Sequence, residues 1–173
     1  PFTAITASTG LGKSTKLPWL LHRIMTYIVY QDRQDTNQDK RTMRTRIAFT
    51  TPRIEPTTNA ARFQAYLVEG CINEKGGIPD AYTDLTDSHY AQYQHKVNPE
   101  GNGRHISNMK RDTPMAGYVR CMTDGLLLMQ CQSSRLTTKF DDLAHDFPYD
   151  CVAIDESHEH SSNMDLLLGM VWK

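Results

Sequence analysis

The feature that most constrains this chain is a glycine-rich turn at residues 7–15, which reads Ala-Ser-Thr-Gly-Leu-Gly-Lys-Ser-Thr. An apolar, β-prone run precedes the turn at residues 2–7, and an apolar-periodic stretch follows it at residues 17–30. A strand, a glycine-rich turn and a helix that begins with Lys-Ser-Thr are the layout of a phosphate-binding loop, in which backbone N–H groups wrap the anion at a helix N-terminus. We therefore predict that the start of the chain binds a nucleoside triphosphate.

Each residue type in this loop has an expected task. Gly10 and Gly12 allow the backbone to approach phosphate oxygens with no Cβ in the way. Lys13 is expected to reach the β- and γ-phosphates, and the Ser14 hydroxyl is placed to bind Mg²⁺. The pattern G-x-x-x-x-G-K-[ST] is met except at its first position, where the chain has Ala7. The alternative is a glycine-rich turn that happens to precede a helix. The predicted nucleotide-binding residues are Thr9, Gly10, Leu11, Gly12, Lys13, Ser14 and Thr15.

Composition limits the class of protein. The 173 residues are enough to bury one core and are expected to form one domain. Because 19 Lys and Arg stand against 20 Asp and Glu, any basic surface for nucleic acid must be local. The four cysteines show no C-x-x-C spacing and are expected to be reduced thiols of an intracellular protein. No apolar run approaches the roughly twenty residues of a membrane span, and no secretory leader is visible.

Apolar residues at three- and four-residue steps predict a first helix over residues 13–30. Its expected apolar face consists of Leu17, Leu20, Leu21, Ile24 and Ile28. Residues 31–46 have no apolar period and are expected to be a solvated loop, although their basic side chains could touch an anionic polymer. Further helices are predicted at residues 56–68 (closed by Gly70), 126–131, 140–146 and 163–172.

Short β-branched or aromatic runs predict strands at residues 2–7, 46–51, 117–122 and 149–154. The last of these has no polar alternation and is expected to be a central strand buried on both faces. Residues 71–115 must contain some strand, but their pattern does not place it. The histidines of that segment lack metal-ligand spacing and are expected on the surface; they are His89, His95 and His105.

Two carboxylates, Asp155 and Glu156, follow the most strand-like run of the chain. Carboxylates at the end of a buried strand are costly unless they have a task. In a protein with a phosphate-binding loop, the Asp at that place holds Mg²⁺ and the adjacent Glu can orient and deprotonate the attacking water. The alternative is a helix start, where negative charge is favourable in any protein.

Two other predicted strands also end in polar residues. The strand at 46–51 is followed by Pro52 and Arg53, so that Thr51 and Arg53 are expected at the carboxyl edge of the sheet, where ligands bind in open α/β folds. Thr123, Asp124 and Gly125 follow the strand at 117–122. Taken alone, this tripeptide is best explained as a helix N-cap; the alternative is that the Thr123 hydroxyl and nearby backbone hold a nucleic-acid phosphate.

Four stretches, in order, resemble the DEAH-box (DExH) helicases of superfamily 2, motors that hydrolyse NTP and pull on a single strand of RNA or DNA. Residues 10–18 resemble the first motif, and residues 51–53 resemble the Pro-Arg motif that grips nucleic-acid backbone. Residues 122–127 are similar to the Thr-Asp-Gly-Met-Leu-Leu stretch, and residues 155–169 to the Asp-Glu-Ala-His-Glu-Arg box and its helix. The first motif is generic to phosphate-loop NTPases, whereas the last two together are specific. This chain departs from the family at Ile54, Ser157 and His160.

The resemblance implies a three-layer α/β fold with a mainly parallel sheet. Residues 1–173 would be the first RecA-like, ATP-binding domain of a longer protein, with a second RecA-like domain in the same parent chain. By resemblance, Lys13 holds phosphates, Ser14 and Asp155 hold Mg²⁺, Glu156 activates water and His158 couples the site to the second domain. The implied nucleic-acid contacts are Arg53, Thr123, Asp124 and Gly125. In this setting the phosphate contact becomes the better explanation of Thr123.

The implied function is ATP hydrolysis coupled to translocation on, and unwinding of, single-stranded RNA, in the cytoplasm of a cell that would be the host if the source is viral. Two alternatives remain: a phosphate-loop ATPase that remodels a partner other than nucleic acid, and a nucleotide-binding module without turnover. Because a missing arginine finger can cost about 10³–10⁵ in rate, we expect the chain alone to bind nucleotide weakly and hydrolyse it barely.

Overall fold

The computed structural model describes residues 3, 5, 10–36, 45–70, 76, 91–96, 118–137 and 149–171. Helices and strands alternate along this part of the chain. In order, the elements are α1 (Lys13–Thr36), β1 (Arg46–Thr51), α2 (Ile54–Glu69), β2 (Ala91–Gln94), β3 (Tyr118–Thr123), α3 (Asp124–Thr137), β4 (Cys151–Ile154), the 3₁₀ turn η4 (Ser157–Glu159) and α5 (Ser162–Val171).

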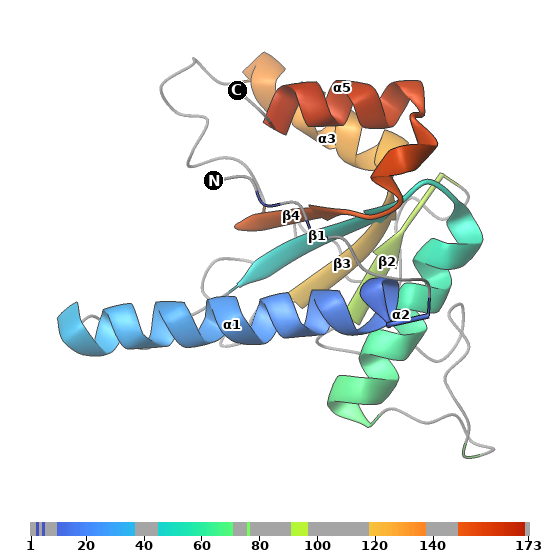
Figure 1. The fold of residues 1–173 in the computed structure, drawn as a ribbon. Helices are drawn as coiled ribbons and strands as arrows, with labels where there is room; N and C mark the ends of the chain where they lie inside the picture. Colours follow the sequence, from blue (N-terminus) through green and yellow to red (C-terminus); the bar gives the residue numbers. More distant parts are fainter. Residues whose placement is uncertain are drawn as a thin grey trace.

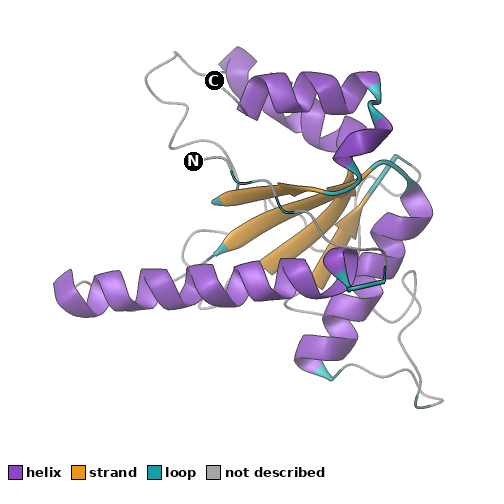
Figure 2. Ribbon diagram, viewed as in Figure 1, coloured by secondary structure: helices purple, strands orange, loops and turns teal. Residues whose placement is uncertain are grey.

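The four described strands form one parallel sheet in the order β2-β3-β1-β4. Helices α1 and α2 cover one face of this sheet, and α3 and α5 cover the other (Figure 1; strands and helices are separated by colour in Figure 2). Since a parallel sheet needs crossover connections that place helices on its faces, three layers are the natural result. The arrangement confirms the predicted α/β class with a parallel sheet and is compatible with a RecA-like fold.

The pleat of the strands divides the core into two layers. Ile47 and Phe49 of β1 lie with Val119 and Cys121 of β3 in the layer beneath α1 and α2. Ala48 of β1 points to the opposite layer, which contains residues of α3 and α5. Because successive residues of a strand face opposite sides, one short apolar run serves both layers. Continuous apolar runs such as β1 are therefore typical of a sheet that is covered twice.

The strand predictions are confirmed to different degrees. The strand at 46–51 is found as β1, and the strand predicted at 117–122 is found one residue later as β3. The expectation of a central strand at 149–154 is wrong for the described sheet, because β4 pairs there with β1 alone and its residues are half-buried. Most of the strand predicted at 2–7 lies outside the described residues, and Thr3 and Ile5, which are described, are not in a strand.

Strand β2 is the element that the pattern did not place. Its Gln92 and Gln94 face α3 and interrupt the apolar run, but both accept hydrogen bonds from the buried guanidinium of Arg120 on β3. The surface position expected for His95 is wrong, because this side chain follows β2 into the core, is fully buried and stacks on Tyr93 with ring centroids 5.7 Å apart. His89 and His105 lie outside the described residues.

Four of the predicted helices are found among the described residues, but not with every predicted boundary. α2 ends at Gly70 in the left-handed conformation (φ 62°), as a glycine C-cap requires, and α5 lies where predicted. α1 continues to Thr36, so the loop expected at 31–46 is wrong for residues 31–36, and α3 continues to Thr137 rather than ending at 131. The helix predicted at 140–146 lies outside the described residues.

The face of α1 that contacts the sheet also differs from the prediction. Trp19, Leu21 and Met25 pack against the core, whereas Ile24 and Ile28 are 45% and 58% exposed. Two overlapping apolar stripes run along this helix, and periodicity alone does not choose between them. One contact that sets the rotation of the helix is long-range: Gln64 of α2 donates a hydrogen bond to the carbonyl oxygen of Thr15. Among the described residues, no helix is long and apolar enough to cross a membrane.

Candidate nucleotide-binding site

The glycine-rich turn has the backbone that a phosphate-binding loop needs. Gly10 and Gly12 adopt positive φ angles of 85° and 82°, in a region that side chains disfavour. A Cβ on Gly12 would also lie 3.1 Å from Cδ of Lys16. The carbonyl of Gly12 accepts the first helical hydrogen bond from the amide of Lys16 at 2.7 Å, which starts α1 directly after the turn. The predicted contact of Thr9 lies outside the described residues and stays a prediction.

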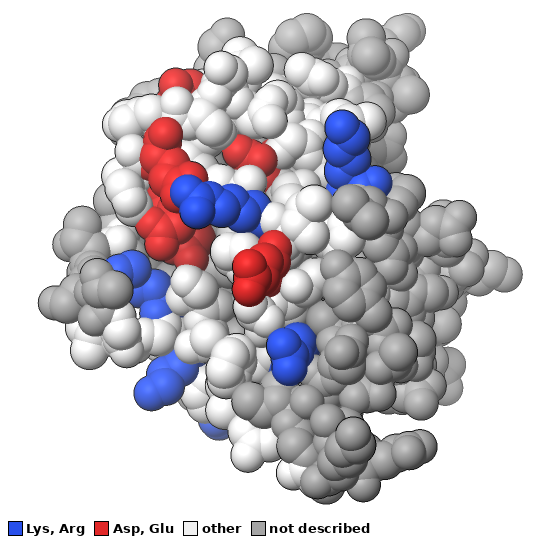
Figure 3. Space-filling model, turned by 90° about the vertical axis from the view of Figure 1, so that its right-hand side faces the viewer, with Lys and Arg blue, Asp and Glu red and all other residues white. Residues whose placement is uncertain are grey.

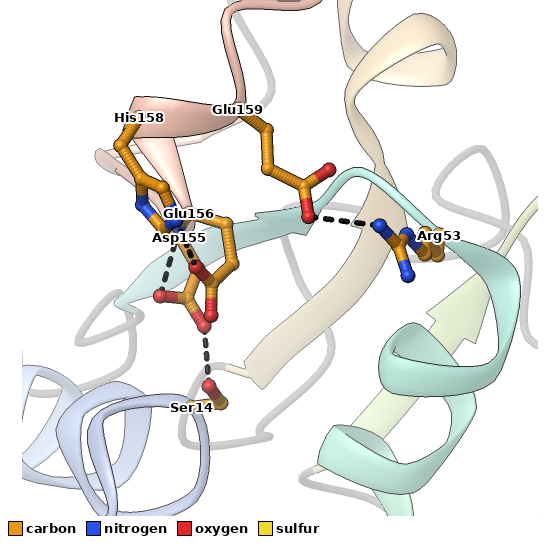
Figure 4. Close-up of polar contacts among 6 residues, drawn as sticks. All are labelled: Ser14, Arg53, Asp155, Glu156, His158 and Glu159. Atoms are coloured by element: carbon orange, nitrogen blue, oxygen red, sulfur yellow. Dashed lines mark hydrogen bonds and ion pairs between the residues drawn. The ribbon is translucent and has the colours of Figure 1, made fainter. Parts of the chain in front are cut away.

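Ser14 and Asp155 are 141 positions apart in the sequence, and the fold brings them together. The Ser14 hydroxyl donates a hydrogen bond to Oδ2 of Asp155 (Figure 4). Asp155 directly follows β4, and its amide continues the ladder by donating to the carbonyl of Thr50 at 3.0 Å. Its other carboxylate oxygen accepts a hydrogen bond from the amide of Glu156 at 2.9 Å. The start of α1 and the carboxyl end of β4 therefore meet at one point.

This pair fits a magnesium ion that is shared with phosphates. Mg²⁺ prefers oxygen ligands and is usually held by one or two carboxylates together with substrate phosphates and water, rather than by a protein cage. Ser14 and Asp155 provide one hydroxyl and one carboxylate oxygen at adjacent positions. Within the part of the chain that the structure describes, no group of three or more His, Cys, Asp or Glu side chains could enclose a metal ion. The donor set is therefore incomplete without phosphate oxygens.

Glu156 begins a short turn with strained ends. Glu156 and His160 both have positive φ angles, 53° and 46°, and they bracket η4. The turn is closed by a hydrogen bond from the amide of Glu159 to the carbonyl of Glu156 at 2.9 Å. Nε2 of His158 lies 3.3 Å from Oε2 of Glu156, and both side chains reach solvent (Figure 4). The predicted catalytic Glu156 and His158 are thus neighbours in space, beside Asp155.

Arg53 lies on the other side of the same turn. Its Nη2 forms an ion pair with Oε1 of Glu159 at 3.1 Å, and 73% of the Arg53 side chain is exposed (Figure 4). Two buried side chains hold the backbone of Arg53 in place. Its carbonyl accepts hydrogen bonds from the hydroxyls of Thr51 (3.0 Å) and Thr57 (2.7 Å). Thr51 is therefore a buried support of the loop, and the exposed guanidinium is what Arg53 offers to a ligand.

The Thr-Asp-Gly segment is joined to the region after η4. Thr123 pairs in register with Thr51, so the predicted nucleic-acid residues share one sheet edge. Asp124 is buried; its carboxylate accepts hydrogen bonds from the amide of Gly125 at 2.6 Å and from the hydroxyl of Ser161 at 2.7 Å. A Cβ on Gly125 would lie 3.0 Å from Nδ2 of Asn163. The nucleic-acid contacts predicted for Thr123, Asp124 and Gly125 stay predictions.

Sequence reasoning missed three supporting residues, which are Thr57, Gln64 and Ser161. Ser161 caps α5, since its hydroxyl accepts a hydrogen bond from the amide of Met164 at 3.2 Å. A serine directly before an apolar helix is a recognisable N-cap signal, so this residue could have been found. Thr57 and Gln64 make contacts whose partners the local pattern does not indicate.

Charge is distributed unevenly over the face shown in Figure 3. Acidic side chains gather at its upper left, whereas the described Lys and Arg side chains are spread singly. Gathered carboxylates favour a cation nearby and disfavour a bare polyanion. A nucleic-acid backbone that binds near these carboxylates would therefore depend on individual cationic side chains, such as the exposed Arg53.

Comparison with known proteins finds two relatives that are named as RNA helicases. No protein-family model matches the chain. A putative ATP-dependent RNA helicase of Acanthamoeba polyphaga mimivirus is 30% identical over 190 aligned positions, which cover 96% of this chain and 9% of that protein. The ATP-dependent RNA helicase HrpA of Escherichia coli (strain K12) is 45% identical over 51 residues, which cover 30% of this chain and 3% of HrpA. The chain thus spans less than a tenth of each relative's length. The expected likeness to RNA helicases is confirmed as a similarity over this part of the relatives.

Proposed function

We propose that this chain is the nucleotide-binding, first RecA-like domain of a DExH RNA helicase, which couples ATP hydrolysis to movement along single-stranded RNA. The observation that carries the proposal is the contact between Ser14 and Asp155. A phosphate-binding loop alone supports nucleotide binding and little more. A carboxylate that lies beside the loop hydroxyl would supply the metal ligand that hydrolysis requires. The similarity to proteins named RNA helicases supports a helicase rather than another kind of ATPase.

In this proposal the chain's own residues position the phosphates and the water. Lys13 and the amides of the loop hold the β- and γ-phosphates, and Ser14 and Asp155 hold the metal ion. When bound, Mg²⁺ neutralises the charge that develops during phosphoryl transfer. Glu156 follows Asp155 and would accept a proton from the attacking water, a role that contributes about 10²–10⁴-fold to the rate of such reactions.

The RNA face would lie at the ends of β1 and β3. Arg53 presents an exposed guanidinium there, and Thr123 is in register with Thr51 on the neighbouring strand. Contacts to phosphate fix the register of a nucleic-acid strand without reading its sequence, which suits a motor that moves along RNA. His158 would couple the site to a second RecA-like domain of the parent chain. That domain would supply the arginines that complete the nucleotide site. We place the whole protein in the cytoplasm.

Two equilibrium titrations test the proposal on the 173-residue chain. A fluorescent ATP analogue with Mg²⁺ measures nucleotide binding, and a labelled single-stranded oligouridylate measures RNA binding. We expect Lys13→Ala to abolish nucleotide binding but to retain RNA binding, because it removes a phosphate contact and leaves Arg53 in place. Arg53→Gln should weaken RNA binding without abolishing nucleotide binding. Lys16→Ala, an exposed position one turn into α1, is the matched control for Lys13.

The outcomes separate the proposal from its rivals. A chain that binds nucleotide but no RNA would favour an ATPase that acts on another kind of partner. Binding of both ligands, without any hydrolysis by the longer protein that includes a second domain, would favour a module that has lost turnover. Failure of the folded chain to bind nucleotide with Mg²⁺ would overturn the proposal altogether.

A further inference from the structure

Two contacts join the segment after β4 to the two strand ends of the proposed RNA face. Asp124 at the end of β3 accepts a hydrogen bond from Ser161 at 2.7 Å, and Arg53 after β1 pairs with Glu159 at 3.1 Å. Both partners, Glu159 and Ser161, lie within six residues of Glu156 in the sequence. The segment that carries the proposed catalytic carboxylate is thus tied at two points to residues proposed to contact RNA.

The two contacts differ in how easily they exchange. Asp124 is buried and each of its carboxylate oxygens accepts one hydrogen bond, so breaking the bond to Ser161 would leave Oδ2 without its donor in a desolvated place. The pair of Arg53 and Glu159 lies at the surface, with 73% and 32% of the side chains exposed, and ion pairs that solvent reaches contribute little to stability. The first contact is therefore a fixed anchor, whereas the second can be replaced by another anion at small cost.

The turn between these contacts is strained at both ends. Glu156 and His160 hold left-handed backbone conformations that residues with a Cβ disfavour, and η4 has no buried residue to fix it. Strained residues persist only where their surroundings hold them, and they are concentrated in segments that switch. The exposed pair with Arg53 is one of the contacts that hold this turn.

From these observations we infer that Glu159 is a positioning residue that occupies the RNA-phosphate site of Arg53. When an RNA phosphate binds the guanidinium, it displaces the Glu159 carboxylate and releases the turn that carries Glu156 and His158. The planar guanidinium can bind two oxygens of a phosphate at once, whereas the contact between Arg53 and Glu159 joins Nη2 to Oε1 alone, so the exchange is chemically favourable. The inference rests on the proposed function, because it requires that RNA reaches Arg53.

Competition for Arg53 predicts that removing a side chain raises the affinity for RNA. Loss of the Glu159 charge should tighten RNA binding, whereas loss of a merely structural contact would weaken it or leave it unchanged. We expect Glu159→Gln to lower the dissociation constant for a single-stranded oligouridylate about two- to fivefold, the range that an exposed pair allows. Fluorescence anisotropy at fixed ionic strength measures this constant.

Two controls isolate the pair from general electrostatics. Glu55→Gln removes the same charge from an exposed position two residues after Arg53 and should change RNA binding less than Glu159→Gln does. In an Arg53→Gln background, the gain from Glu159→Gln should vanish, because the competition has no site. Melting curves establish that each variant is folded.

A second measurement follows the release of the turn. If RNA moves the turn beside Asp155, saturating RNA changes the affinity for nucleotide, and by linkage nucleotide changes the affinity for RNA by the same factor. In Glu159→Gln that factor should move toward one, since RNA no longer has a carboxylate to displace. A structural support with no part in coupling would leave the factor unchanged.

The failures of the two proposals are distinguishable. If Arg53→Gln weakens RNA binding while Glu159→Gln leaves it unchanged or weaker, the inference is overturned and the proposed function stands. If Arg53→Gln has no effect on RNA binding, Arg53 is not an RNA contact and the inference falls with that part of the proposed function.

Discussion

At the scale of single residues, the glycines of the first turn show how conformation and space act together. Gly10 and Gly12 have nearly the same positive φ, but only Gly12 has neighbours within 4 Å of an added Cβ. Gly169 in α5 is the opposite case, with an ordinary helical conformation and open space around it. The same chemical change, Gly to Ala, should therefore have opposite effects at positions 12 and 169.

Gly12→Ala is expected to lower the free energy of unfolding by about 1–2 kcal/mol, because a Cβ is disfavoured in the left-handed region. It should also weaken nucleotide binding, since strain at Gly12 would distort the loop whose amides are proposed to hold the phosphates. Gly169→Ala is expected to raise the free energy of unfolding by about 0.5–1 kcal/mol, because a helix interior favours Ala. Urea unfolding of both variants measures these changes; equal effects at the two positions would contradict the described backbone.

Burial of His95 makes stability depend on pH. Loss of water around the ring lowers the pKa of His95 from its ordinary value of 6.5, because burial disfavours the charged imidazolium. Below pH 6.5 the unfolded chain therefore binds a proton that the folded chain lacks, and stability falls as the pH falls. We expect His95→Gln to reduce the stability lost between pH 7.5 and 5.5 by about 1 kcal/mol. The same pH dependence in both proteins, measured by urea unfolding, would show that His95 is not buried as a neutral ring.

At the scale of elements, the orientation of α1 is the feature most open to a direct test. Met25 packs on the core and Ile24, its neighbour in sequence, is 45% exposed. Met25→Ala should lower the free energy of unfolding by about 1–2 kcal/mol, less than at a fully buried site, because Met25 is only partly buried. Ile24→Ala should stay within about 0.5 kcal/mol of the parent protein. The reverse order of the two effects would indicate that the predicted stripe of Leu20, Ile24 and Ile28 faces the sheet.

Elements differ in how far local sequence predicts them, and the reasons are physical. The short run of β-branched and aromatic residues in β1 is compatible locally with a buried strand and little else. The bounds of β1 were therefore predicted correctly. β2 contains two glutamines whose hydrogen-bond partners include Arg120 and Gln130, which lie 26 to 36 positions away in the sequence. The rotation of α1 likewise depends on a bond from Gln64 that has no local signal.

The residues of the candidate site were easier to choose from the sequence than the contacts of the fold around them, although their roles stay predictions. Phosphate and magnesium chemistry restricts the residue types at positions 13, 14, 155 and 156 so strongly that spacing and order are informative. Residues that support the site by long-range contacts follow no such rule, which is why Thr57 and Gln64 were missed. Many residue types can hold a neighbouring side chain or backbone in place, whereas few residue types can bind a metal ion.

At the scale of the whole molecule, one sheet edge collects residues from four parts of the chain. The turn before α1, the ends of β1 and β3, and the segment after β4 all meet there (Figures 1 and 4). The central claim is that this edge binds a nucleotide together with Mg²⁺ through Ser14 and Asp155. The metal dependence of nucleotide affinity depends on both residues at once and on the fold that joins them.

The most direct test is therefore a titration of a fluorescent ATP analogue with and without Mg²⁺ for the parent chain, Ser14→Ala and Asp155→Asn. Ser162→Ala and Asp165→Asn are matched controls, since both residues are exposed on α5. We expect Mg²⁺ to raise the affinity of the parent and control chains about tenfold or more, and each site variant to lose most of that gain. An equal gain in all five proteins would contradict a magnesium–nucleotide site at Ser14 and Asp155.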